Sequence, residues 1–580
     1  MFTQKPVFKS HFRKFKIGFA LLLSLTSISS LAQLSSLIHD MPNNSNYMTL
    51  RQKEMNFVDS IQRTLKGADS LEFYSGCGEF KAMKKFTQQW DTRLYPSGSF
   101  EDYFGALRTF YDSSLSNYDY ITEESWRELG PNKPSIAGDK GVGPVEFITI
   151  YDDGTPQSTR YMLTGSLLGG LFYSEDYGET WNSTGTDTYW AQSGVSSAVY
   201  DPLDHTKWYA ASSGNDLSGS SSWVGLTGGV YRTDDNGSSW VQIADHTDLA
   251  GRYTVIYKLV IVPKSNQNDP TVLFAATSHG IYRTNNADVE NPIWAQVYDS
   301  FAYDLEIKPD NSQYLYATGK SGNYWKVLES NNSGLSFTAM STQPIQLGFP
   351  TKFDAQMGML RNIHLTIEVT KARKNYLYCH SRDTISDDDN KRFYTKDISN
   401  PNSSWAEFAS YSDKSTFGWG HGFGVEQKSN GLEVLSSMGT KMARIDLING
   451  SVTEVDPVHV DLEDFVYHPY NIGEVWSATH GGVEKRAHYT QPWVAKYEGL
   501  GVAQVQKFTN SYTDPKYIIA GLYHDGSQIT RSEYSAVNWD PTGLMLRVVM
   551  VNNHLLITKN QIICGAPHNK VPGIFRQITC

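Results

Sequence analysis

The chain has 580 residues, of which 39% are hydrophobic, 13% aromatic and 19% charged, and 47 are glycine. That length exceeds what one ordinary core supports, and the composition favours an all-β repeat protein with many turns over a helical bundle or a disordered chain. The formal net charge of −11 argues against a nucleic-acid partner, because phosphate binding requires clustered Lys and Arg.

The N-terminal residues 1–32 differ from the rest of the chain. Basic residues precede the apolar run IGFALLLSLTSISSLA, which ends at Ala32. This pattern predicts a signal peptide cleaved after Ala32, and hence a secreted or cell-surface protein. An uncleaved anchor is the alternative, but the apolar core is shorter than the ~20 residues that a spanning helix needs. Cleavage removes five positive and no negative charges, so the formal net charge falls from −11 to −16.

Residues 33–125 follow a helical period. Phe57, Ile61 and Leu65 fall on one helix face at four-residue spacing, and the stretch FEDYFGALRTFY repeats this pattern. We predict a short helical leader that packs on the main domain. A removable pro-segment is the alternative.

The helical period stops at Trp126, and from Val145 onward short runs of β-branched and aromatic residues alternate with Gly, Asn, Asp and Ser. One cycle of four such runs spans AVYDPLDHTKWYAASSG and GGVYRTDDNGSSWVQI. Successive cycles close on an aromatic residue at intervals of 59, 54, 43 and 68 residues, at Trp181, Trp240, Trp294, Phe337 and Trp405. This period predicts an all-β fold, a β-propeller of seven to ten four-stranded blades over residues 126–580. The chain stops at GIFRQITC within strand-like sequence, which leaves open whether its C-terminus is truncated.

Two nearly identical stretches, YSEDYGETW and YRTDDNGSSW, close the first two cycles, and LESNNSGLSF is a near copy. A short carboxylate or hydroxyl can accept hydrogen bonds from its own turn, and a glycine can adopt the positive φ of a tight hairpin. The final aromatic ring is expected to pack between blades. Because a catalytic group is not needed in every blade, we assign a structural role to Ser174, Asp176, Gly178, Thr180, Trp181, Thr233, Asp235, Gly237, Ser239, Trp240, Ser330, Asn332, Gly334, Ser336 and Phe337.

This skeleton, S/T-x-D-x-G-x-T/S-W/F, resembles the Asp-box, or BNR repeat, of sialidases, xyloglucanase-type glycosidases and the sortilin propeller. The copies at residues 281–294 and 392–405 carry insertions and lose the glycine. The layout from WRELGP to GLGVAQVQKF also resembles large propellers that bacteria secrete by the type IX route, although the C-terminal sorting domain that often accompanies them is not visible. Sialidase activity is disfavoured, because GVGPVEFITIYDDG lacks the Arg-Ile-Pro motif of that family.

The densest group of candidate catalytic residues is VHVDLEDF, residues 458–465. On a strand, His459, Asp461 and Glu463 alternate onto one face and Asp464 lies on the other. A glycosidase needs two carboxylates about 5 to 9.5 Å apart, so Asp461 or Glu463 is a candidate for one of them, with its partner unassigned, and His459 is a candidate ligand contact. The resembling secreted propellers tend to have HVDxH here, and Glu463 in place of the last histidine puts a shared metal site in doubt. An exposed strand face or a satisfied hydrogen-bond network is the alternative.

Two further segments supply candidate ligand contacts. FGWGHGFGV places Trp419 and His421 among glycines that allow close approach of a ligand, and an aromatic ring can stack on a sugar. GLYHDGSQI contributes His524 and Asp525. A packing loop and a turn, respectively, are the structural alternatives. No metal or cofactor motif is convincing, and the four cysteines could form up to two disulfides.

We therefore expect a secreted or cell-surface propeller that holds a protein or glycan partner at one rim, with no nucleic-acid partner, no membrane span after signal removal, no metal and no cofactor. A glycoside hydrolase of xyloglucanase-like type, acting on an extracellular polysaccharide, is the alternative function. A maturation or assembly factor for other exported proteins is a third, by analogy of fold alone.

Overall fold

The computed structural model describes most of residues 141–510 and the strands between residues 517 and 563, with its longest gaps before residue 510 at 214–226, 351–364, 414–421 and 427–432. Apart from isolated positions, residues 1–140 lie outside the described part, and with them the predicted signal peptide and helical leader. The helical element whose full bounds the structure describes is a short 3-10 helix, η1 (Pro156–Arg160).

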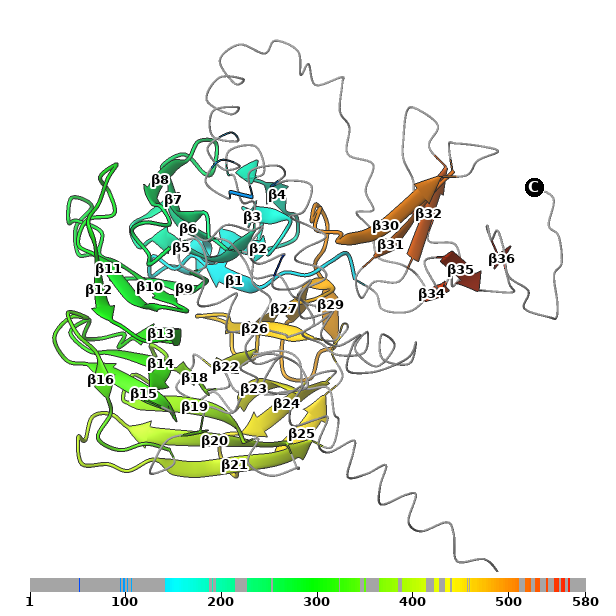
Figure 1. The fold of residues 1–580 in the computed structure, drawn as a ribbon. Coiled ribbons are helices and arrows are strands. Elements are labelled where there is room, and N and C mark those ends of the chain that lie inside the picture. Colours follow the sequence, from blue (N-terminus) through cyan, green and yellow to red (C-terminus); the bar gives the residue numbers. More distant parts are fainter. Residues whose placement is uncertain are drawn as a thin grey trace, which may run out of the picture.

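Seven antiparallel sheets form the blades of a propeller (Figure 1). Blades 1 to 4 comprise β1 (Phe147–Ile150), β2 (Met162–Ser166), β3 (Gly170–Ser174) and β4 (Asn182–Ser183); β5 (Val195–Asp201), β6 (Asp204–Ser212), β7 (Gly229–Thr233) and β8 (Val241–Ala244); β9 (Ile256–Ile261), β10 (Leu273–Thr277), β11 (Gly280–Thr284) and β12 (Trp294–Tyr298); and β13 (Ala302–Ile307), β14 (Leu315–Ser321), β15 (Tyr324–Ser330) and β16 (Thr338–Ala339), with β17 (Phe349–Pro350) paired to β15.

Blades 5 to 7 continue the same order along the chain. They comprise β18 (Leu365–Glu368), β19 (Tyr376–Asp383), β20 (Asp389–Asp397) and β21 (Ala406–Asp413); β22 (Phe423–Val425), β23 (Glu433–Met438), β24 (Lys441–Asp446) and β25 (Val452–Val455); and β26 (Leu462–Tyr467), β27 (Val475–Thr479), β28 (Gly482–Arg486) and β29 (Trp493–Ala495). The prediction of an all-β propeller with four-stranded blades is confirmed, and the ring has seven of them.

The first strand of each blade lines the centre of the ring. Each of these strands contacts the first strands of both neighbouring blades, and β1 contacts β26, so the circle closes between blades 1 and 7. Polar side chains tie one inner strand to the next. Thr149 donates to the carbonyl of Ala198 at 2.7 Å, and Ser196 donates to the carbonyl of Ile256 at 2.6 Å. Buried backbone groups at the centre are thereby paired across blades.

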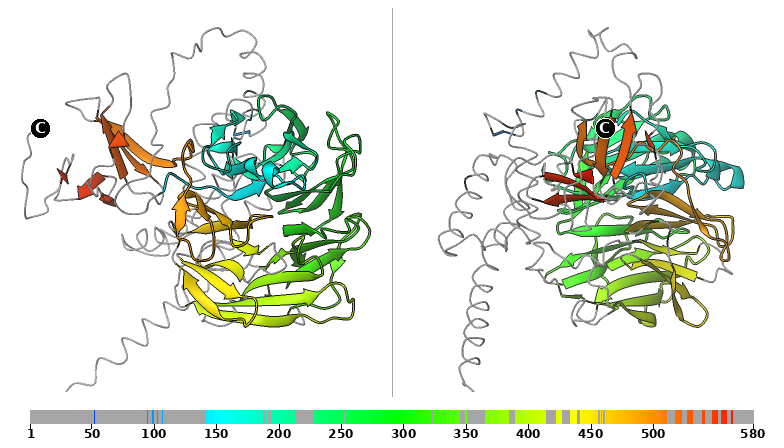
Figure 2. Two further views of the ribbon diagram at one scale, coloured as in Figure 1. Left: turned by 180° about the vertical axis from the view of Figure 1, so that it is seen from behind. Right: turned by 90° about the vertical axis from the view of Figure 1, so that its right-hand side faces the viewer.

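Two further sheets follow the ring and lie outside it (Figures 1 and 2). They comprise β30 (Val505–Asn510), β31 (Tyr517–Leu522), β32 (Ser527–Arg531) and β33 (Trp539–Asp540), then β34 (Arg547–Val551), β35 (His554–Thr558) and β36 (Ile562–Ile563). The cycle expected near residues 505–530 therefore forms strands that are not part of the ring, because β26 and β1 have already closed it.

The turns between the third and fourth strands of blades 1, 2 and 4 share one hydrogen-bond pattern. The Asp176 carboxylate accepts hydrogen bonds from the Ser174 hydroxyl at 2.8 Å and from the Thr180 backbone N–H at 2.9 Å. The N–H of Gly178 donates to the Ser174 hydroxyl at 2.9 Å. Equivalent bonds link Thr233, Asp235, Gly237 and Ser239 in blade 2 and Ser330, Asn332, Gly334 and Ser336 in blade 4, where an amide replaces the carboxylate.

The glycine of this turn is required on two grounds. Gly178 has a φ of +70°, and a Cβ atom there would lie 2.6 Å from the ring of Trp476 in blade 7. The preceding residue, Tyr177, also has a positive φ, of +61°, which the sequence did not indicate. The aromatic residues that end the three copies, Trp181, Trp240 and Phe337, pack in the hydrophobic clusters between blades 7 and 1, 1 and 2, and 3 and 4, respectively.

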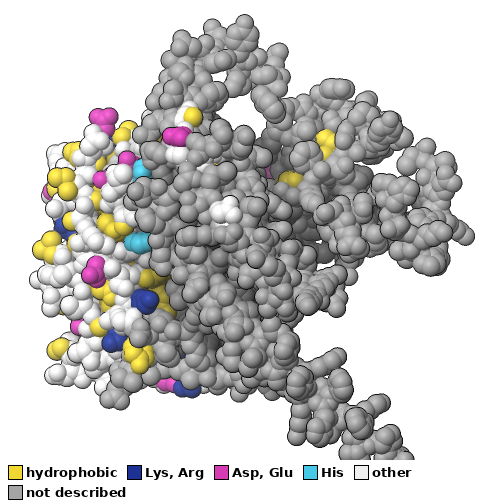
Figure 3. Space-filling view, in the orientation of Figure 1, with side chains coloured by type: hydrophobic (Ala, Val, Ile, Leu, Met, Phe, Trp, Pro, Cys, Tyr) yellow, Lys and Arg dark blue, Asp and Glu magenta, His cyan; other side chains and the backbone are white. Residues whose placement is uncertain are grey.

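The surface around blades 3 and 4 shows no concentration of one kind of side chain on the face seen in Figure 3. Hydrophobic, acidic and basic side chains alternate there, and single exposed apolar residues such as Ile293 are ordinary on a protein surface. In the part of the chain that the structure describes, no helix has the length and apolar character to cross a membrane.

Candidate functional site

The predicted catalytic segment lies at the start of blade 7. The strand β26 begins only at Leu462, so His459 and Asp461 precede it, and the register with β27 shifts between Leu462 and Asp464. Asp461 has a φ of +57°, a left-handed conformation that aspartate tolerates better than most residues. The simple alternation of one strand face therefore does not extend back to Asp461.

A histidine that the sequence prediction did not include joins the two candidate carboxylates. His480 lies in the tight turn between β27 and β28, and its Nε2 is 3.1 Å from Oε1 of Glu463. Its Nδ1 is 3.7 Å from Oδ2 of Asp461, and its backbone N–H donates to the Asp461 carbonyl at 3.1 Å. We call Asp461, Glu463 and His480 the blade 7 cluster.

The blade 7 cluster is closed off from solvent. The side chains of His480, Asp461 and Glu463 are 2%, 5% and 6% exposed. Next to it, the backbone N–H of His459 donates to the buried carboxylate of Glu484 at 2.6 Å. A Cβ atom at Gly481 would lie 2.4 Å from the His459 ring, so only glycine allows this approach.

This geometry limits what the two carboxylates can do. A glycosidase places its carboxyl groups on either side of the scissile bond of a bound sugar. Here the imidazole of His480 contacts one carboxylate through each ring nitrogen and occupies the space between them. The three side chains therefore form a buried charged cluster at the start of blade 7.

A second group of charged side chains lies on the inner strands. Lys258 of β9 contacts Asp304 at 2.7 Å and Glu306 of β13 at 2.5 Å. Asp464 of β26 accepts a hydrogen bond from the N–H of Ile148 at 3.1 Å. Among the described residues, no three His, Cys, Asp or Glu side chains are arranged to hold a metal ion.

Burial changes the proton affinity of these inner carboxyl groups. Burial raises the pKa of Glu306 to about 7, although the nearby Lys258 ammonium favours the charged form. Burial also raises the pKa of Asp464 to about 6, against the effect of the Ile148 hydrogen bond. Burial and the neighbouring Glu306 raise the pKa of Glu368 well above its ordinary value. The centre of the propeller therefore takes up protons near neutral pH.

We expect Glu306→Gln to flatten the pH dependence of stability. Because the folded-state pKa of Glu306, about 7, lies above its ordinary value of 4.5, its stabilising proton is fully bound below pH 4.5 and is lost as pH rises through 7. The free energy of unfolding should fall by about 2 kcal/mol more in the wild type than in the variant between pH 5 and pH 7.5. Urea unfolding at both pH values measures this.

The control for that experiment is Glu179→Gln, which changes an exposed glutamate paired with Lys496. It should leave the pH dependence of the wild type in place. Equal slopes for the wild type and Glu306→Gln would contradict the assignment of the proton to Glu306.

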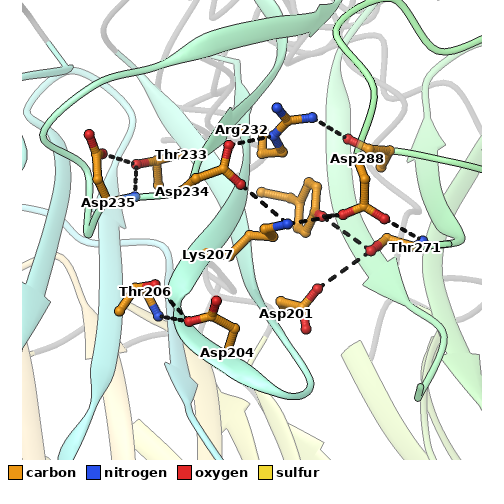
Figure 4. A network of polar contacts seen from close by, with 12 residues as sticks. Asp201, Asp204, Thr206, Lys207, Arg232, Thr233, Asp234, Asp235, Thr271 and Asp288 are labelled. Carbon is orange, nitrogen blue, oxygen red and sulfur yellow. Dashed lines mark hydrogen bonds and ion pairs between the residues drawn. The ribbon is translucent and has the colours of Figure 1, made fainter. Parts of the chain in front are cut away.

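A third polar network joins blades 2 and 3 (Figure 4). Asp201 at the end of β5 contacts Lys264 at 2.9 Å, and both side chains are buried. Asp288 accepts hydrogen bonds from the Thr271 N–H at 2.8 Å and from Lys207 at 3.2 Å. The groups pair with one another rather than pointing into a cavity, so this network fastens two blades together.

A pocket with a volume of about 310 Å³ lies between the outer parts of blades 6 and 7. Among the described residues its walls combine arginine, aromatic, proline and amide side chains and no carboxyl group; they are formed by Arg444, Val455, Pro457, Arg486, Tyr489, Gln491, Pro492 and Trp493. Pockets of this size bind small ligands or single units of a larger one. We call it the blade 6/7 pocket.

Four other residues were predicted to contact a ligand. Trp419, His421, His524 and Asp525 lie outside the described residues. The end of the same glycine-rich segment forms the inner strand β22, and a Cβ atom at Gly424 would lie 2.5 Å from the Phe465 carbonyl oxygen. The glycines described there serve close packing of blade 6 against blade 7. Cys379 is a free, buried thiol of β19.

The sequence prediction did not include His480, Arg444 or Arg486. His480 stands in THGG, where the two glycines signalled a turn and the histidine at its tip could have been named. The arginines lie on β24 and β28 of different blades, and no local pattern relates them.

Comparison with solved structures finds other propellers. The GH74 enzyme of Niastella koreensis shares 12% identity over 74% of this chain and 71% of its own, with a TM-score of 0.47. The GH74 xyloglucanase of Xanthomonas campestris shares 12% identity over 67% of this chain and 59% of its own, with a TM-score of 0.46. The propeller domain of Cps50 (Swd1) of Myceliophteria thermophila shares 9% identity over 60% of this chain and 97% of its own, with a TM-score of 0.40. No protein-family model matches the sequence, and no curated protein does. These likenesses concern the fold alone.

Proposed function

We propose that the mature chain is an extracellular binding module whose propeller holds a protein or glycan partner at its rim. The observation that carries this proposal is the composition of the blade 6/7 pocket. Among the residues that the structure describes, its walls offer aromatic rings and hydrogen-bond donors and no carboxyl group. Such a pocket can bind a ligand, whereas glycoside hydrolysis ordinarily requires two carboxyl groups at the scissile bond.

The state of the predicted catalytic residues also supports binding. Asp461 and Glu463 are buried and are engaged by His480. A buried carboxylate that contacts a histidine is poorly placed to protonate a leaving group or to activate water. The extracellular location rests on the signal-peptide pattern of residues 1–32.

Binding and hydrolysis can be separated with two conservative variants. The mature chain and its Asp461→Asn and Glu463→Gln variants should be tested against a panel of immobilised polysaccharides and extracellular proteins, with reducing-sugar release measured in parallel. We expect retention of at least one partner, with affinity unchanged within about twofold in both variants, and no release of sugar.

A release of sugar by the wild type that both variants abolish would contradict the proposal and favour the glycoside hydrolase. Failure to retain any glycan or protein would contradict it as well. Thermal unfolding of each variant checks that a loss of retention does not come from misfolding.

A further inference from the structure

The two arginines of the blade 6/7 pocket are fixed by one buried carboxylate. Glu433 contacts the Nε of Arg444 at 2.6 Å and also pairs with Arg486. The Tyr467 hydroxyl also donates a hydrogen bond to Glu433 at 2.9 Å. Glu433 does not line the pocket, so the pocket wall presents the guanidinium groups and not their counter-charge.

Hydrogen-bond donors in the pocket wall lack an acceptor. Arg486 is 4% exposed at its side chain, and its Nε–H has no hydrogen-bond partner among the residues that the structure describes. The same is true of the buried indole Nε1–H of Trp493. Because a buried donor without an acceptor costs free energy, a ligand oxygen that reaches either donor after a small side-chain shift gains that free energy.

The pocket walls are rigid and partly aromatic. The Arg486 guanidinium lies 5.5 Å from the centre of the Trp493 ring and 5.8 Å from that of Tyr489. The Tyr489 hydroxyl is in turn hydrogen bonded to Glu426, which is buried. Contacts of this kind hold the guanidinium in one orientation, so that little entropy is lost when it binds a planar anion.

From these features we infer that the blade 6/7 pocket binds a uronic acid residue of an acidic glycan, with the carboxylate on the arginines and the sugar ring beside Trp493. This rests on the proposed binding function and names the class of ligand. A guanidinium presents paired N–H donors that match the two oxygens of a carboxylate.

The number of donors favours a sugar acid over an acidic peptide side chain. Donors come from Arg444, Arg486, Trp493 and the amide of Gln491, which together exceed what the two oxygens of one carboxylate can accept. The hydroxyl groups of a uronic acid supply further acceptors around the ring. A volume of about 310 Å³ suits one compact unit of this kind.

The test is calorimetric titration of the mature chain with oligogalacturonate, with a neutral galactose oligosaccharide of equal length and with an acidic peptide. We expect the neutral oligosaccharide to bind at least tenfold more weakly than oligogalacturonate, and the acidic peptide to bind more weakly as well. Arg444→Met should weaken oligogalacturonate binding by about tenfold or more, because one charge-assisted contact is lost. Trp493→Phe keeps a ring but removes the indole donor, and should weaken binding severalfold.

The matched control is Arg392→Met in blade 5, because Arg392 has a side-chain exposure of 37%, against 38% for Arg444, and also pairs with a glutamate. It should leave the affinity unchanged within twofold. Arg444→Met is expected to fold, because Glu433 keeps its contact with Arg486.

Equal affinity for the charged and neutral oligosaccharides, tighter binding of the acidic peptide, no binding of oligogalacturonate, or no effect of Arg444→Met would each overturn the inference. If a different glycan or protein still binds and Arg444→Met does not affect it, the binding function stands and only the uronate assignment fails. Sugar release that depends on Asp461 would instead overturn the binding function itself.

Discussion

Trp181→Ala is expected to destabilise the propeller by about 3 to 5 kcal/mol, the usual cost of deleting a buried aromatic side chain. The Trp181 ring is 2% exposed and packs with Trp476 and Tyr497 where blade 7 meets blade 1. Its Nε1–H also donates to the Lys496 carbonyl at 3.0 Å. The variant therefore opens a cavity at the closure of the ring. Guanidinium chloride unfolding of both proteins measures the loss.

The control variant for this prediction changes a residue of the same turn. Tyr177 is 44% exposed and has a positive φ, which asparagine tolerates well. Tyr177→Asn should change the free energy of unfolding by no more than about 0.5 kcal/mol. If Trp181→Ala were as mild as Tyr177→Asn, the closure between blades 7 and 1 would not depend on this ring.

Asp201→Asn is expected to cost about 3 kcal/mol, because it leaves the Lys264 ammonium buried without its nearest counter-charge. The two groups are 2.9 Å apart, with side-chain exposures of 0% for Asp201 and 4% for Lys264. Asparagine keeps an oxygen that can accept the Leu203 N–H bond, so the change isolates the charge. Urea unfolding measures the loss of unfolding free energy, on the condition that its slope against urea concentration is the same in both proteins.

Two control variants test whether the unpaired buried charge causes the loss of stability. The double variant Asp201→Asn/Lys264→Met removes both charges and should recover most of the loss, since no unpaired charge then remains. Glu179→Gln removes an exposed pair with Lys496 and should cost less than about 1 kcal/mol. A double variant as unstable as Asp201→Asn would show that the buried charge is not the cause.

The candidate site was only partly accessible to sequence reasoning. The acidic segment around Asp461 and Glu463 was predicted from its composition, and in the structure both carboxylates contact the same side chain. That side chain is His480, which lies in the turn of the following hairpin. The blade 6/7 pocket could not be predicted, because Arg444 and Arg486 come from different blades and share only Glu433, a residue with no distinguishing local motif.

The sequence by itself determined the repeating unit of this protein and the chemistry of its turns. Those features are local: strand alternation has a period of two residues, and the Asp176 carboxylate bonds Thr180 only four positions away. The tertiary structure alone decided the number of blades, the strand that closes the ring and the side chains that share a pocket. These depend on contacts such as that of Asp464 with Ile148, 316 positions apart, whose formation is governed by the curvature and packing of the whole ring.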